Sequence, residues 1–335
     1  MTLRTLLLAT AASAVGLPAL ADVNVYTTRQ PGLIQPVIDA FTAQTGIAVN
    51  LAFVEEGLVE RLVAEGDRSP ADLVMTVDIA NLHQIVEAGV TQPVASEVLE
   101  AAIPENLRGP DGLWFALTQR ARILYASKER VAEGEVTTYE DLADPKWQGR
   151  ICTRPGTHNY NLALLAAVIA HHGEDYARTW AEGVKANLAK TPEGNDRGQV
   201  RSIWAGECDV SLGNTYYMGQ MVEDPEQKEW AESVRIEFPT FEETGGTHIN
   251  VSGVAMTKAA PNREEALQLM EFLVSPEAQA IYAEENHEYP VVAGTELSDL
   301  VASWGELTPD TIDLTELAGH RAEALRIMEE VNFDG

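Results

Sequence analysis

The order of strand-like and helix-like segments near the start of the chain limits the possible fold most strongly. Short runs of apolar and β-branched residues alternate with longer stretches whose apolar residues recur at helical spacing. The predicted strands are residues 23–27, 47–54 and 71–77, and the predicted helices are residues 32–46, 57–66 and 80–90. Because strands alternating with helices form a parallel sheet covered by those helices, the sequence predicts an α/β fold.

A second α/β region follows a long extended segment, residues 114–127, which is long enough to cross between two lobes. Residues 249–257 predict a strand that returns to the first lobe. The region between them predicts strands at 150–153, 208–213 and 234–238, and helices within 159–190, within 196–206 and from about 216. The C-terminal part predicts a helical region at 263–286 with a proline break, and one amphipathic helix at 314–333. Two lobes joined by crossing strands would leave a cleft, and ligands of open α/β sheets bind beyond the carboxyl ends of the strands.

The first 21 residues have the pattern of an export signal. Arg4 precedes a short uncharged apolar run, and the small residues Ala19 and Ala21 predict cleavage after Ala21. A membrane anchor is the alternative, but the apolar run is short for a membrane span. The formal charge of -29 argues against nucleic acid or an anionic membrane as a partner. We therefore expect a soluble, exported protein, and we also predict that it is a monomer.

The chain has two cysteines, Cys152 and Cys208, and each lies in a predicted short strand. An even pair in an exported protein predicts a disulfide, because the compartment is oxidising. Two buried free thiols are the alternative.

Three tyrosines lie at predicted helix starts. Tyr216 and Tyr217 follow Asn214 and Thr215, which are good N-cap residues, and Tyr160 follows a similar turn. A helix N-terminus favours negative charge, and a highly charged cation favours the phenolate far more. Three phenolates would balance the charge of a ferric ion, whereas the simpler alternative is that the rings pack and the hydroxyls form ordinary hydrogen bonds.

Stretches along nearly the whole chain resemble one family. They include "VNVYTTR", "PADLVMTVDIANLHQIVEAGVTQPV", "GLWFALTQRARILYASKERV", "THNYNLALLAAVIAHHG" and "DRGQVRSIWAGECDVSLGNTYYMGQM". The chain is similar to the periplasmic ferric-iron-binding proteins of bacterial ABC importers, a transferrin-like branch of the solute-binding proteins. The resemblance implies a type II binding-protein fold, with a mixed sheet flanked by helices in each lobe and hinge strands between the lobes. It also implies Fe³⁺ ligation by Tyr160, Tyr216 and Tyr217, and delivery to an ABC permease in the inner membrane.

We expect residues 1–21 to be the signal peptide. Lobe 1 is predicted to comprise residues 22–118 and 244–290, and lobe 2 to comprise residues 119–243 and 291–335.

The chain departs from the family pattern where many relatives carry a histidine and a tyrosine. Gln30 and Pro31 stand at those places, so the first lobe offers at most the weak ligand Gln30. Water, carbonate or another synergistic anion would then complete the iron site. Arg120 matches a family arginine near the metal, and it could hold that anion or form an ordinary ion pair.

Several neighbouring residues are weaker candidates. Arg29 could act like Arg120, and His158 could support Tyr160 or only stabilise a turn. His171 and His172 are expected to serve the C-terminal end of a helix.

Two other functions stay open at this point. The same scaffold could bind a small organic ligand, such as a polyamine or an anion, because a fold does not determine function. A secreted enzyme is disfavoured, since no catalytic motif stands out in the sequence.

Overall fold

The computed structural model describes residues 21–54 and 56–335, so the predicted signal peptide lies almost entirely outside the described residues. The strands are β1 (Val23–Thr27), β2 (Val49–Phe53), β3 (Leu73–Thr76), β4 (Phe115–Ser127), β5 (Ile151–Cys152), β6 (Val210–Asn214), β7 (Val234–Glu237), β8 (Ile249–Met256) and β9 (Tyr289–Pro290). The first helices are α1 (Gln35–Thr45), α2 (Leu58–Glu65), α3 (Ile79–Glu87), α4 (Glu97–Ala102), α5 (Asn159–His172), α6 (Glu174–Ala186) and α7 (Asp196–Trp204). The later helices are α8 (Tyr216–Glu223), α9 (Lys228–Glu232), α10 (Arg263–Leu273), α11 (Pro276–Glu285), α12 (Asp299–Ala302), α13 (Leu314–Gly319) and α14 (Arg321–Glu330).

The strands form one mixed sheet of nine strands in the order β2-β1-β3-β8-β4-β6-β5, and β7 and β9 also pair with β4. Strand β1 pairs in parallel with both β2 and β3, as the β-α-β-α-β order predicts. Strand β8 runs antiparallel to β3 and to β4. The fold is therefore α/β with a mixed sheet, and this expectation is confirmed.

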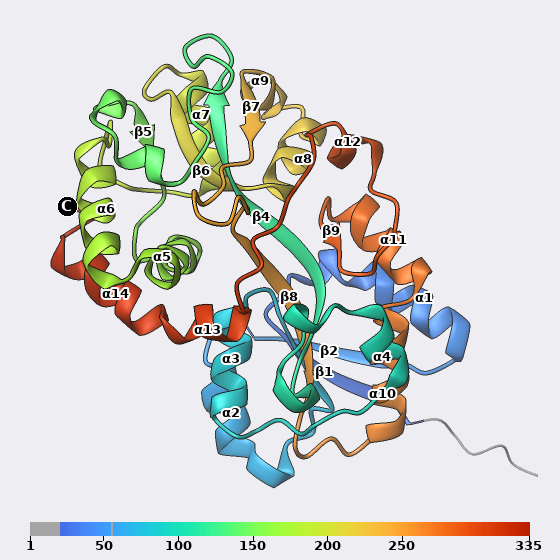
Figure 1. Ribbon diagram of the computed structural model, residues 1–335. Coiled ribbons are helices and arrows are strands. Elements are labelled where there is room, and N and C mark those ends of the chain that lie inside the picture. The colour runs from blue at the N-terminus through green and yellow to red at the C-terminus, as the bar shows by residue number, and fades with distance from the viewer. Residues whose placement is uncertain (1–20, 55) are drawn as a thin grey trace, which may run out of the picture.

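Strand β4 connects two groups of elements. It pairs with β8 over Phe115–Ala121 and with β6 over Arg122–Ala126, so its partner changes between Ala121 and Arg122. Figure 1 shows β4 passing from the group around β1, β2 and β8 to the group around β5, β6 and β7. The lobe boundaries expected from the sequence, with the first change at residues 118 and 119, stay a prediction.

Local sequence explains most of the element boundaries. Helix α1 buries Val37, Ile38 and Phe41 and ends at Gly46, whose φ of 75° is left-handed. Glycine adopts that conformation without a steric penalty and is common at helix ends. Predicted strands and helices in the first 90 residues agree with the structure to within a few residues.

The C-terminal prediction of one helix over residues 314–333 is wrong. The structure has α13 and α14, separated at His320, whose ψ of 0° leaves the helical range. Gly319 precedes this break and has low helix propensity. The break lets α13 pack against α3 and α5, whereas α14 packs against α5 and α6 (Figure 1).

Two further expectations concern Cys152 and Thr215. A disulfide joins Cys152 to Cys208 with alpha carbons 5.9 Å apart, so that prediction is confirmed. Thr215 takes the N-cap position of α8, but its side chain makes no capping hydrogen bond. Its Oγ1 accepts a hydrogen bond from the backbone of Ala121 instead. None of the helices within the described ranges is long and apolar enough to cross a membrane.

Candidate functional site

A cleft of about 290 Å³ lies where the two groups of elements meet. Its walls come from the segment after β1, from β4, from the starts of α5 and α8, and from the turn after α11. The lining residues are Thr28, Arg29, Gln30, Leu33, Val77, Arg120, Tyr160, Arg197, Tyr216, Tyr217, Gln220, Asn286 and Glu288. The cleft thus contains all three predicted tyrosines, together with Arg29, Arg120 and Gln30.

The three tyrosines come together at two helix starts. Tyr216 and Tyr217 open α8 directly after β6, and Tyr160 is the second residue of α5. The hydroxyls of Tyr160 and Tyr216 share a hydrogen bond of 3.1 Å, and the ring centroids of Tyr216 and Tyr217 are 4.2 Å apart. Hard oxygen donors this close to one another are suited to a hard cation.

Tyr216 and Tyr217 are neutral at physiological pH unless a cation binds. Burial, followed by the neighbouring Tyr160 and Tyr217 phenols, raises the pKa of Tyr216 well above its ordinary value. Burial and the Tyr160 phenol likewise raise the pKa of Tyr217 to about 12. A cation that binds here must therefore displace phenolic protons.

Arg120 and Arg29 differ in how their charges are balanced. Arg120 is buried beside the tyrosines, and its Nη2 donates to the carbonyl of Val77. It forms no ion pair with a carboxylate in the described part of the chain, and its Nη1 has no protein acceptor there. Arg29 donates to both carboxylate oxygens of Glu288 at 2.9 Å. Arg120 is thus free to balance an added anion, while the charge of Arg29 is already paired.

His158 acts as the N-cap of α5. Its Nδ1 accepts a hydrogen bond of 3.2 Å from the backbone N–H of Tyr160, and the two ring centroids are 4.7 Å apart. Burial and the nearby Arg154 lower the pKa of His158 to about 4, so the imidazole is neutral at pH 7. His158 thus orients the start of the helix that carries Tyr160.

Gln30, the weak ligand expected from the first lobe, lies exposed at the edge of the cleft.

His171 and His172 lie in the last turn of α5, as expected from the sequence. They contact Asp310 and Glu140, each at 2.6 Å. Neither histidine lines the tyrosine cleft.

Four charged residues near the tyrosines had not been predicted from the sequence. Arg154 lies with its Cζ 4.8 Å from the centre of the Tyr160 ring, and it pairs with the buried Asp196. Arg197 and Glu288 line the cleft. The place of Arg154 just after a predicted strand was a usable signal, but nothing local marked Asp196 or Glu288.

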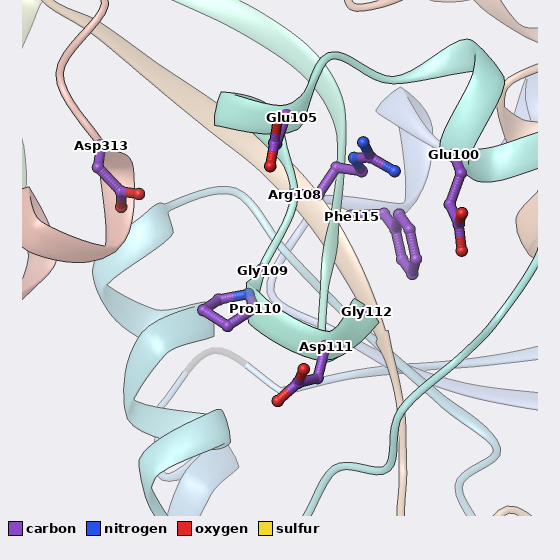
Figure 2. Close-up of a pocket in the computed structure, with 9 residues that line it drawn as sticks. All are labelled: Glu100, Glu105, Arg108, Gly109, Pro110, Asp111, Gly112, Phe115 and Asp313. Atoms are coloured by element: carbon purple, nitrogen blue, oxygen red, sulfur yellow. The ribbon is translucent and has the colours of Figure 1, made fainter.

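A different pocket of about 370 Å³ lies between α4 and β4 (Figure 2). Its lining includes the acidic side chains Glu100, Glu105, Asp111 and Asp313, spread around the pocket, and Arg108. Among the residues that the structure describes, no group of three or more His, Cys, Asp or Glu side chains could hold a metal ion. The tyrosine cleft is therefore the candidate site. A mixed sheet in two groups, joined by crossing strands around such a cleft, defines a type II periplasmic binding protein.

Comparison with known proteins places the chain within this class. Residues 68–304 match the model of the bacterial extracellular solute-binding protein family, and the chain belongs to that family. It is 46% identical over 315 residues to iron uptake protein A1 of Synechocystis sp., covering 93% of this chain and 87% of that protein.

Two solved structures have nearly the same fold. The Bordetella ferric binding protein superposes with a TM-score of 0.88 at 48% identity, covering 94% of this chain and 100% of that one. A Trichodesmium protein in complex with iron and citrate ligands superposes with a TM-score of 0.88 at 40% identity, covering 93% and 99%.

Proposed function

We propose that this protein captures ferric iron in the cleft through the phenolates of Tyr160, Tyr216 and Tyr217. The observation that carries the proposal is the 3.1 Å contact between the Tyr160 and Tyr216 hydroxyls, with the Tyr217 ring tilted against that of Tyr216 at a centroid distance of 4.2 Å. Two phenol oxygens at this distance can both reach one ion after a small adjustment. Three phenolates match the three charges of Fe³⁺, and hard anionic oxygen is the donor type that such a cation prefers.

An anion completes the coordination of the iron. The cleft volume of about 290 Å³ exceeds what one ion needs, and Gln30 at the cleft edge is only a weak neutral donor. Arg120 brings a buried positive charge without a carboxylate partner. A carbonate or citrate-like anion could therefore bind both the iron and the Arg120 guanidinium. The structure of the Trichodesmium relative contains iron and citrate ligands.

The family to which the chain belongs supports delivery to a permease as part of this proposal. Members of this family act with ABC transporter permeases. We infer that the chain is exported with cleavage after Ala21, that its lobes close around the bound ion, and that the closed form presents iron to a permease. Closure of this kind is the common motion of two-lobed binding proteins, and it requires that the ion bind the closed form more tightly.

The test uses the visible charge-transfer absorption of iron phenolates. Ferric loading should colour the protein, and Tyr217→Phe should weaken the band and shift it. Tyr176→Phe, which changes an exposed tyrosine on α6, is the matched control and should leave the band unchanged. A protein that stays colourless with ferric citrate but binds a polyamine would refute the proposal and favour an organic ligand.

A further inference from the structure

A second, smaller cavity also lies against Tyr160. Its volume is about 10 Å³, which is close to the space that a single water molecule needs. Its walls come from β4, β6, β8 and α5, and they include Arg120, Arg122, Asn214 and His248. Tyr160 and Arg120 line both this cavity and the cleft, so the two spaces are neighbours.

Three hydrogen-bond donors on the cavity walls lack an acceptor within the described residues. They are Nη1 of Arg120, Nε of Arg122 and Nδ2 of Asn214, and each of these residues is only 3% exposed. The Asn214 amide is oriented by its Oδ1, which accepts a 3.1 Å hydrogen bond from Arg122. Buried donors without a partner are rare and destabilising, which indicates that something in the cavity accepts from them.

The charges around the cavity are unequal. Arg122 and Arg154 both pair with the one carboxylate of Asp196, at 2.7 Å and 3.1 Å. Arg120 has no carboxylate partner in the described structure. The Cζ atoms of these three arginines lie 4.8 to 5.9 Å from the centre of the Tyr160 ring. Three guanidinium groups thus share one negative charge in a buried region.

We propose that the cavity binds one monoatomic anion of the halide class, such as chloride. A water molecule accepts only two hydrogen bonds, whereas three donors on the walls of this cavity lack an acceptor. A halide accepts all of them and also reduces the surplus positive charge. A volume of about 10 Å³ is too small for carbonate, citrate or phosphate. Halide binding here does not require iron.

The first test is a crystal of the iron-free protein grown with bromide in place of chloride. The expected result is an anomalous peak within hydrogen-bonding distance of Nε of Arg122 and Nδ2 of Asn214. Density for a water molecule without a bromide peak would overturn the proposal.

The second test measures thermal stability of the iron-free protein against chloride at constant ionic strength, with gluconate as the replacing anion. Saturating chloride should raise the Tm of the unmodified protein by about 2–5 °C. Asn214→Asp places a fixed negative charge at the cavity and should abolish this dependence. Asn106→Asp adds the same charge at an exposed position and should retain it. An equal chloride response in both variants would show that chloride acts elsewhere on the protein and would overturn the proposal, and the bromide crystal decides the matter if Asn214→Asp does not fold.

Discussion

Iron binding through phenols should depend steeply on pH, and Tyr217→Phe should reduce that dependence by a predictable amount. Burial and the neighbouring Tyr160 raise the pKa of Tyr217 to about 12. At pH 7, removing this proton costs about 7 kcal/mol, which the bound cation must supply. Because the phenolate is the form that binds, each phenol makes the apparent affinity rise by about tenfold per pH unit below its pKa.

With three phenol ligands, the affinity of the unmodified protein for iron should rise by about a thousandfold per pH unit. The affinity of Tyr217→Phe, which keeps two phenol ligands, should rise by about a hundredfold per pH unit. The sign is that iron binds more tightly as pH rises and is released as pH falls. The ratio of the two affinities should therefore change by about tenfold per pH unit, in favour of the unmodified protein at higher pH.

The assay is competition for ferric iron against citrate at pH 6, 7 and 8, read from the visible absorption of the protein. The protonation of citrate and the hydrolysis of iron affect both proteins equally, so they cancel in the ratio. Tyr176→Phe is the control and should give a ratio that does not change with pH. If the ratio for Tyr217→Phe is also constant across this range, Tyr217 does not bind iron as a phenolate and the reasoning fails.

Three further predictions concern stability, all measured by urea unfolding of the iron-free protein. Burial and Arg122 lower the pKa of His248 to about 3, so the unfolded chain takes up a proton that the native state excludes as pH falls below about 6.5. Between pH 7 and pH 5 this proton uptake lowers the free energy of unfolding by about 2 kcal/mol, and His248→Gln should abolish that loss. An unchanged dependence of the unfolding free energy on pH in His248→Gln would contradict this. Gly219→Ala should lower the free energy of unfolding by about 1–3 kcal/mol, because its Cβ would lie 2.2 Å from the His287 ring. Adding His287→Gly to this variant should restore most of that loss; if it does not, the contact with His287 is not the cause. Replacing both Cys152 and Cys208 by serine should cost about 2–4 kcal/mol, as the bridge closes a loop with a sequence separation of 56, and reductant should destabilise the unmodified protein equally.

Periodic patterns in the sequence predicted many of the strands and the longer helices. The spacing of apolar residues identified β1 to β3 and the extended β4, because neighbouring residues within each segment carry that pattern. The break between α13 and α14 was missed, because the apolar pattern continues through Gly319 and His320. Beyond this break, α13 packs against α3 and α5, whereas α14 packs against α5 and α6.

The tyrosines could be found from the sequence, whereas their charged surroundings could not. Tyr160, Tyr216 and Tyr217 each follow residues typical of a helix start, and this local signal placed them near the carboxyl ends of strands. The pairing of Arg122 with Asp196 joins residues 74 positions apart, and that of Arg29 with Glu288 joins residues 259 apart. In a chain with 52 acidic residues, no local pattern selects these two carboxylates as partners.

The surplus of arginine around Tyr160 links the two anion sites that we propose. A ferric ion that binds three phenolates adds no net charge, so it leaves unchanged the imbalance between three guanidinium groups and the single carboxylate of Asp196. An anion in the cleft can balance Arg120 from the side of the iron. A halide in the second cavity can balance Arg120 and Arg122 beside Tyr160. Because Arg120 lines both spaces, an anion bound in one of them lowers the affinity of the other for a second anion. Chloride should therefore lower the affinity of the iron-loaded protein for a synergistic anion, and Asn214→Asp should produce the same reduction without chloride.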